Sequence, residues 1–286
     1  MSAIKGKAMK NKSFIKCCGI FLLALLAVGA AGCNGDQRAK AIYRKHIVNI
    51  AGSTSVMPFT EKLAEHFMVE QPTFIINVQA GGSTAGIQAT MNKTVEIGMS
   101  SRELKADEKK LQEITICLDG IAIVVHPDNP VTSLKLSQVR DIFSGKVKNW
   151  KELGWLDRRI DAVTREEGSG TRGAFEELVM HKDQIDDGIM VQDSNGSVKE
   201  VVATDPYAIG YLSLGMVDER VSAVTIDAVR PTAEAIKKKQ YKIVRPFLYL
   251  TMGDPTGDAT IFINYVLSKD GQLLLKKEGL IPVNEF

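Results

Sequence analysis

Apolar residues along the chain fall into short runs of strand length and longer segments with helical spacing, separated by small turns. Strands are predicted from His46 to Ala51 and from Thr73 to Val78, and each is followed by a turn of glycine and hydroxyl residues. Between them, Pro58 to Glu70 carries apolar residues at helical spacing, with proline in the first turn, where a helix tolerates it. This order predicts an α/β fold.

The rest of the chain repeats this pattern. Further strands are predicted at 95–99, 114–125, 160–165, 207–214, 221–226 and 247–252. Further helices are predicted at 136–143, 172–180, 258–267 and 270–278, and one more follows the second strand and ends at Ala89. About 254 residues beyond an N-terminal leader are enough for a large core, close to the size at which one core divides into two.

Three turns share one composition and one position, between a predicted strand and a predicted helix. They are GSTS at 52–55, GGST at 81–84 and GSGT at 168–171. Each turn alone is typical of an ordinary helix cap. Together they favour a binding site, because helix N-termini attract anions and ligands collect at the carboxyl ends of strands. The third turn lies in TREEGSGTR, where Arg165 adds a permanent positive charge.

The N-terminal segment has the pattern of an export signal. Residues 1–16 contain five lysines and no acidic residue, and an apolar run of 15 residues follows at 17–31. The run ends in AAGC, which resembles a bacterial lipobox, although that pattern prefers leucine where Ala30 stands. We therefore expect a lipoprotein signal peptide at 1–32, with ordinary signal cleavage as the alternative.

The expected mature chain is exported and anchored to the membrane through a lipid on Cys33. Residues 33–45 are polar and are expected to form a tether, so the protein would be a periplasmic or cell-surface lipoprotein. Without the five signal lysines, 31 basic and 34 acidic residues remain, a net charge of −3. This balance argues against general nucleic-acid binding, so an anion would have to be held by local geometry.

Two further motifs have ordinary structural interpretations. Cys117 is the one cysteine beyond the leader and Cys33, so no internal disulfide is expected, and its apolar surroundings predict a buried thiol. The segment KVKNW at 146–150 mixes basic and aromatic residues as some nucleic-acid contacts do. We expect instead that Trp150 packs into the core.

Longer blocks of sequence resemble one known family. GSTSV, AGGSTAG, VEIGMSSREL at 95–104, IFSGKVKNW at 142–150 and TREEGSGTR resemble the periplasmic phosphate-binding proteins of phosphate ABC importers, the PstS family. The resemblance runs from about residue 47 to the C-terminus. It implies a type II periplasmic solute-binding fold, in which two lobes are joined by a two-strand hinge and the ligand lies in the cleft.

The resemblance also implies boundaries and ligand contacts. Lobe I would comprise 46–122 and 246–286, lobe II would comprise 123–245, and the hinge would cross near 123–125 and 245–247. The charged, planar guanidinium of Arg165 would donate hydrogen bonds to two oxygens of the anion at once. The implied phosphate-binding residues are Ser53, Thr54, Ser55, Ser83, Ser101, Arg102, Arg165, Ser169, Gly170 and Thr171.

One position departs from the family pattern. Well-known members have an aspartate where this chain has Ser101, and that aspartate accepts the proton of hydrogen phosphate. A serine there should reject sulfate less strongly. Arg102 would add a second positive group or face solvent, and Glu167 is expected to orient Arg165.

The implied function is reception of inorganic phosphate for the permease subunits of an ABC importer, by lobe closure and without chemistry. No cofactor, metal or nucleic acid is expected, and the protein is expected to be a monomer. A receptor for sulfate, molybdate or tungstate is one alternative. A phosphatase or serine hydrolase is another, but the chain lacks GxxxxGK[ST], HExxH, GxSxG and CxxC, and its four histidines have no catalytic pattern.

Overall fold

The first strands of the chain form a parallel sheet with β1 (His46–Gly52) in the middle. In the computed structural model, which describes residues 45–284, β1 pairs with β2 (Phe74–Ala80) on one side and with β3 (Ile97–Ser100) on the other. Val48 and Ile50 are fully buried, because helices cover this part of the sheet. The parallel arrangement brings the carboxyl ends of these strands to one edge.

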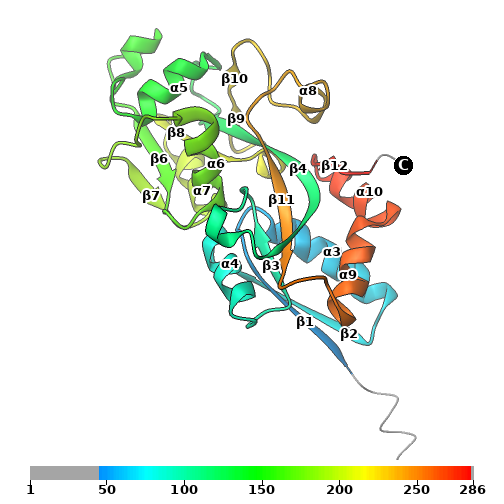
Figure 1. Cartoon of the computed structure of the whole chain (residues 1–286). Helices are drawn as coiled ribbons and strands as arrows, with labels where there is room; N and C mark the ends of the chain where they lie inside the picture. The colour runs from blue at the N-terminus through cyan, green and yellow to red at the C-terminus, as the bar shows by residue number, and fades with distance from the viewer. Residues whose placement is uncertain (1–44, 285–286) are drawn as a thin grey trace, which may run out of the picture. The chain divides into compact units, whose positions relative to one another are not determined.

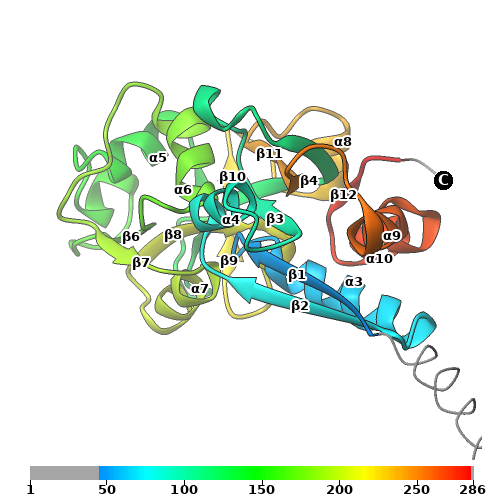
Figure 2. The same ribbon diagram turned by 60° about the horizontal axis from the view of Figure 1, so that its bottom comes forward.

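Four helices pack against this part of the sheet. They are α3 (Met57–Glu70), α4 (Ser83–Met91), α9 (Gly257–Leu267) and α10 (Lys269–Lys277). Figure 2 shows α3 running alongside β1 and β2. Helices α3, α9 and α10 share one apolar cluster with the strands, and its buried members lie between Val48 and Cys117 and between Phe247 and Leu280. Ile87 and Met91 of α4 belong to a smaller cluster that also contains Leu248 and Leu250 of β11.

A second group of elements comes from the middle of the chain. Its strands are β6 (Asp161–Arg165), β7 (Met190–Gln192) and β8 (Ala208–Ser213), in the order β8-β6-β7. Its helices are α5 (Leu136–Phe143), α6 (Gly170–Phe175) and α7 (Asn195–Thr204), and α6 continues as a π-helix, η4 (Glu176–Met180). Two apolar clusters, with members from Ile121 to Ile243 plus Ile281, fill this group.

Two long antiparallel strands connect the two groups, as Figure 1 shows for β4 (Gln112–Val125) and β11 (Val244–Thr251). The first half of β4 pairs with β11, and its second half, Ile121 to Val125, pairs with β8. The strand order β2-β1-β3-β11-β4-β8-β6-β7 therefore runs through both groups. All five residues from Ile121 to Val125 are fully buried.

Short elements complete the described part of the chain. They are the strands β5 (Ser133–Leu134), β9 (Ser222–Ala223), β10 (Thr225–Ile226) and β12 (Ile281–Pro282), the helix α8 (Ala233–Lys237), and the 3₁₀ turns η2 (Ala106–Glu108), η3 (Trp150–Leu153) and η5 (Leu214–Met216). Across residues 45–284, no helix is both long and apolar enough to cross a membrane.

Most predicted elements are present, with three differences. The strand expected at 221–226 is wrong, because β9 and β10 are separate and pair with different strands, β4 and β5. The helix expected at 172–180 begins earlier, at Gly170, and widens to a π-helix at Glu176. The sequence pattern did not predict β5, β7, β12, α7 or α8.

The two structural interpretations are confirmed. Trp150 is fully buried, packs in the middle-chain cluster and donates its Nε1 proton to the carbonyl of Tyr207 at 2.9 Å. Cys117 is a free, fully buried thiol, and burial raises its pKa well above the usual value. The expected signal peptide, the lipidated Cys33 and residues 33–44 of the tether lie outside the described residues.

Candidate anion-binding site

The first two hydroxyl-rich turns meet at the carboxyl ends of β1, β2 and β3. Ser53 follows β1 and donates from Oγ to Oγ of Ser101, at the end of β3, over 2.9 Å. Ser83 begins α4, and its Oγ accepts from the backbone N–H of Ser101 at 3.1 Å. All three serines are buried, so their hydroxyls form a cluster away from bulk water.

The third turn reaches the same cluster from the middle of the chain. Oγ1 of Thr171 lies 2.8 Å from Oγ of Ser55. The backbone N–H of Thr84 donates to the carbonyl of Gly168 at 3.1 Å. The three turns therefore converge on one place, although the third lies more than 80 residues from the other two along the chain.

Gly170 lies at the closest approach between these turns. A Cβ at this position would stand 2.1 Å from Oγ of Ser83 and 2.6 Å from Oγ of Ser101. Both distances are shorter than any real contact, so only glycine fits without displacing the serines. The missing side chain lets the first turn of α6 lie directly against the hydroxyl cluster.

Arg165 ends β6 and brings a buried guanidinium to the site. Its Nη2 donates to Oγ1 of Thr54 at 3.3 Å and to the carbonyl of Asp193 at 3.0 Å. Its Nη1 is the one buried side-chain nitrogen or oxygen in residues 45–284 that has no hydrogen-bond partner. A buried charged donor without a hydrogen-bond partner costs free energy. An anion that accepted a hydrogen bond from Nη1 would remove that cost and form a charge-assisted hydrogen bond.

The acidic partner of Arg165 is Glu166. Its two carboxylate oxygens accept from Nε and Nη2 of Arg165, both at 3.0 Å. The expectation that Glu167 orients Arg165 is wrong, since Glu167 is exposed and the chain turns directly after β6. Glu166 therefore fixes the direction of the guanidinium.

Two other predicted site residues have structural partners. Ser169 is the N-cap of α6, and its Oγ accepts from the backbone N–H of Arg172 at 3.2 Å, which leaves its proton free to be donated. Arg102 is buried and forms a bidentate ion pair with Glu108, with N–O distances of 2.7 and 2.8 Å. That pair lowers the pKa of Glu108, mainly through the hydrogen bonds from Arg102.

Sequence reasoning did not select Asn195. It begins α7 and is fully buried, and its Nδ2 donates to Oγ1 of Thr54 at 3.1 Å and to Oγ of Ser55 at 2.8 Å. Its Oδ1 accepts from the backbone N–H of Ser213 at 3.2 Å. The side chain thus ties the turn after β1 to the middle of the chain. The Ser194–Ser197 hydroxyl pattern of a helix cap was the available signal for this helix.

A buried ion pair between Asp119 and Arg245 was also missed as part of the site. Arg245 donates from Nη2 to Oγ of Ser55 at 3.2 Å and from Nη1 to the carbonyl of Ser101 at 3.3 Å. Nε and Nη2 also donate to Oδ2 of Asp119 at 3.1 and 3.0 Å. Burial raises the pKa of Asp119 and lowers that of Arg245, in each case against the attraction of the partner.

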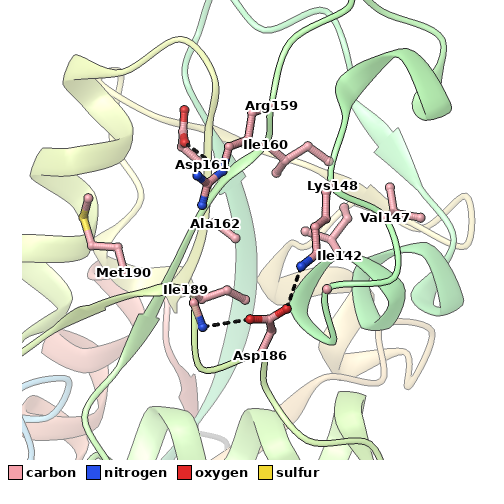
Figure 3. A pocket seen from close by; sticks show the side chains of 12 residues that line it. Ile142, Val147, Lys148, Arg159, Ile160, Asp161, Ala162, Asp186, Ile189 and Met190 are labelled. Carbon is pink, nitrogen blue, oxygen red and sulfur yellow. Dashed lines mark hydrogen bonds and ion pairs between the residues drawn. The ribbon is translucent and has the colours of Figure 1, made fainter.

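A cavity of about 370 Å³ near α5 and β6 is separate from this site (Figure 3). Its charged groups are paired, with Nζ of Lys148 at 3.0 Å from Asp186, and Gly188 also donates to that aspartate. None of the ten predicted site residues lines it. The hydroxyl cluster therefore stays the candidate anion site.

The structure brings Ser53, Ser55, Ser83, Ser101, Gly170 and Thr171 together, with Thr54 and Arg165 beside them. Arg102 is directed to Glu108 instead. Contact of these residues with an anion stays a prediction. The arrangement itself is a set of hydroxyl and guanidinium donors suited to a small oxyanion.

Comparisons with known proteins identify the class. A family model described as PBP superfamily domain matches residues 31–270. A candidate phosphate ABC transporter substrate-binding protein from Clostridium perfringens, solved with bound phosphate, superposes with a TM-score of 0.81 and 44% identity, covering 84% of this chain and 100% of that one. A phosphate transport receptor of ABC type from Vibrio cholerae gives a TM-score of 0.69 and 37% identity over 82% and 99% of the two chains.

These matches define a protein with the mixed α/β fold of the PBP superfamily, which confirms the predicted fold class. The phosphate-binding protein PstS of Bacillus subtilis (strain 168) is 34% identical over 276 residues, 93% of this chain and 92% of that protein. The chain belongs to the PstS family of phosphate-binding proteins. The family resemblance noted in the sequence is thereby confirmed.

Proposed function

We propose that this chain is an extracytoplasmic receptor that binds inorganic phosphate with high affinity and delivers it to an ABC permease. The observation that carries the proposal is Arg165, whose buried Nη1 donor is unpaired beside the place where three hydroxyl-rich turns converge. The family relationship supports the same ligand, since relatives are named phosphate-binding proteins and one was solved with phosphate.

The donor set suits a tetrahedral anion that must lose its water. Removing a charged anion from water is costly unless nearly all of its oxygen lone pairs accept hydrogen bonds. Ser53, Ser55, Ser83 and Thr171 offer hydroxyls within a single cluster. Arg165 adds a planar fork that can meet two oxygens at once. Phosphate would accept from donors on all three turns.

Binding would close two lobes, with lobe I at 46–122 and 246–286 and lobe II at 123–245. Two observations support this division. The apolar clusters separate largely along these limits, and β4 and β11 are the long strands that run between the two groups of elements. The turn 52–55 would come from lobe I and Thr171 from lobe II. Phosphate that contacts both would favour the closed state through contacts the open state lacks.

No chemical step is proposed. In the described residues, the contacts of Ser53, Ser55, Ser83 and Ser101 are hydroxyls, backbone groups, Asn195 and Arg245, without a histidine or carboxylate that could act as their base. His66 and His181 are exposed, and His46 pairs with Asp258 at 2.8 Å. A hydroxyl without a base is a weak nucleophile.

The export and anchoring of the protein belong to the same proposal. The leader at 1–32 would direct export and be removed. The lipid on Cys33 would then hold the receptor at the outer face of the cytoplasmic membrane, as a monomer, within reach of the permease subunits. Intact mass measurement of the protein extracted from membranes tests this directly. A mass that includes residues 1–32 or lacks a diacylglycerol group would contradict the anchor.

Calorimetric titration with phosphate tests the binding function. Arg165→Ala should weaken binding by more than about tenfold, because a charge-assisted hydrogen bond in a buried site is lost. Arg159→Ala, which removes an exposed arginine, should leave affinity unchanged. Unchanged affinity in Arg165→Ala would remove Arg165 from the site.

Two further assays separate the alternatives. Competition with sulfate, arsenate and tungstate shows which oxyanion is preferred, and a preference for sulfate or tungstate over phosphate would replace phosphate as the ligand. Incubation with a chromogenic phosphate ester addresses catalysis. Tight stoichiometric binding of phosphate without ester turnover is expected, and sustained turnover would make the protein an enzyme.

A further inference from the structure

Asp119 and Arg245 form an ion pair inside the protein, directly behind the hydroxyl cluster. They are register partners in the antiparallel pair of β4 and β11, 126 residues apart in sequence. The side chains are 0% and 1% exposed, and Oδ2 of Asp119 accepts two hydrogen bonds from Arg245, at 3.0 and 3.1 Å. A pair buried this deeply loses the hydration of both charges, so it needs a compensating role or compensating contacts.

The contacts of Arg245 point to the anion site. Its two terminal nitrogens diverge, one to Oγ of Ser55 and the other to the carbonyl of Ser101. The planar guanidinium therefore connects the turn after β1 with the end of β3. Since Ser55 also contacts Thr171, the position of Arg245 is transmitted to the third turn.

Asp119 holds the guanidinium in this place. Its second oxygen, Oδ1, accepts from Oγ of Ser213 at 2.9 Å, so both carboxylate oxygens are engaged. Rotation of the carboxylate would break contacts to both β8 and β11. Asp119 thus fixes Arg245 in direction as well as in charge.

The pair also sets the charge near the bound anion. Two ion pairs lie at the cluster, Arg165 with Glu166 and Arg245 with Asp119, and the charges within each pair cancel. Arg172 and Arg102, which donate to the carbonyl of Arg165 and to Oγ1 of Thr84, are likewise paired with Glu176 and Glu108. Burial is the main cause that lowers the pKa of Arg245, and the nearby positive charge of Arg165 lowers that pKa further. In a buried site one unit of charge changes the binding of a dianion about twice as much as that of a monoanion.

We propose that Arg245, positioned by Asp119, is a specificity-determining residue of the anion site. It holds Ser55 and Ser101 in place, and the Asp119–Arg245 pair keeps the net charge of the site low enough to limit binding of fully ionised dianions such as sulfate. The inference rests on the proposed phosphate-binding function and adds to it a charge-based selection between anions.

A set of charge variants tests this selection in the full-length protein. Asp119→Asn removes a negative charge and Arg245→Gln removes a positive one, while the double variant restores the balance. Affinities for sulfate and phosphate are measured at a pH of about 5, where phosphate is mainly a monoanion and sulfate a dianion. Circular dichroism establishes that each variant is folded.

The sulfate-to-phosphate affinity ratio should move in opposite directions. We expect it to rise by about tenfold in Asp119→Asn, to fall by about tenfold in Arg245→Gln, and to return near the wild-type value in the double variant. Arg245→Lys keeps the positive charge but loses the planar guanidinium. It should therefore lower the affinities for sulfate and phosphate alike and leave the sulfate-to-phosphate ratio unchanged. Asp183→Asn, at an exposed ion pair with Lys146, is the matched control and should change neither.

A merely structural pair would weaken the binding of both anions equally. An unchanged sulfate-to-phosphate ratio in folded Asp119→Asn and Arg245→Gln therefore overturns the inference, while phosphate binding by the wild type still stands. The double variant has the best prospect of folding, because removing both partners of a buried pair is better tolerated than removing one. If only the double variant and Arg245→Lys fold, their sulfate-to-phosphate ratios should both stay near the wild-type value, and a changed ratio in either variant would overturn the inference. A wild-type protein that binds neither anion would contradict the proposed function as well.

Discussion

The hydroxyls of Ser55 and Thr171 lie 2.8 Å apart, although 116 residues separate them in the sequence. Ser55 belongs to the turn after β1 and Thr171 to the first turn of α6, so this contact joins the two groups of elements at the predicted anion site. Both side chains are buried, and each hydroxyl can bind an anion oxygen as well as its neighbour.

Thr171→Val tests the contribution of this contact. Valine has nearly the shape of threonine but offers no donor, so Ser55 would lose one partner and phosphate one hydrogen bond. We expect phosphate affinity to fall by about tenfold, measured by calorimetry. Thr204→Val, which removes an exposed hydroxyl at the end of α7, is the control and should not change affinity. Equal affinities for Thr171→Val and wild type would place the anion elsewhere.

Gly170→Ala should be more damaging than the loss of any one hydroxyl. The added methyl would occupy the space of Ser83 Oγ and Ser101 Oγ, so one turn must move away from the others. We expect phosphate affinity to fall by about a hundredfold or more, with a smaller loss of thermal stability. Gly168→Ala is a matched control in the same turn, because its added Cβ would lie at an ordinary 3.8 Å from Thr84. If both variants bind phosphate alike, the turns do not close on the ligand as proposed.

Asn195→Asp tests whether the site depends on donors from α7. The substitution keeps the size of the side chain but replaces a double donor to Thr54 and Ser55 with a carboxylate. A negative charge next to an anion site is repulsive, so phosphate affinity should fall by at least about a hundredfold. Asn195→Ala should lower phosphate affinity less than Asn195→Asp, since it removes the donors without adding a negative charge. An Asn195→Asp variant that binds as well as Asn195→Ala would argue against a nearby anion.

The turns of the site could be predicted because their signal is local. Glycine and hydroxyl residues directly after a strand are typical of the start of a helix, and three such turns in one α/β chain suggested a common edge. Arg165 was found for the same reason, since it stands beside the third turn. The helix 136–143 also follows from apolar spacing alone.

The missed residues depend on contacts that no short window contains. Asp119 and Arg245 become neighbours only through the register of β4 and β11, which follows from tertiary packing. Asn195 lies in SNGS, a sequence typical of a loop, and only the cap of Ser194 on Ser197 shows that a helix begins there. The prediction that Glu167 rather than Glu166 orients Arg165 was wrong, because the direction of each side chain depends on where β6 ends and the chain turns.

The pair of Arg102 and Glu108 offers a pH-dependent test of whether Arg102 acts on the anion or on the fold. Both side chains are buried and joined by two short hydrogen bonds, and the pKa of Glu108 is lowered by them. A carboxyl group with a lowered folded-state pKa stabilises the protein above its unfolded-state pKa. That stabilisation is lost as the pH falls through the folded-state value.

Glu108→Gln should therefore destabilise the protein by about 3 kcal/mol at neutral pH, because it leaves Arg102 buried without its counter-charge. The difference between variant and wild type should shrink in acid, where Glu108 of the wild type is itself protonated. Urea unfolding at pH values from neutral to acidic measures both effects, and Glu103→Gln, which changes an exposed neighbouring carboxylate, is the control.

Phosphate affinity decides the role of Arg102. Because its guanidinium is directed to Glu108, folded Arg102→Met should lose stability but keep its phosphate affinity within about twofold. An affinity loss of about tenfold or more, with stability unchanged, would instead make Arg102 a ligand contact, as the family resemblance had implied. In that case Glu108 would orient Arg102 toward the anion, much as Glu166 orients Arg165.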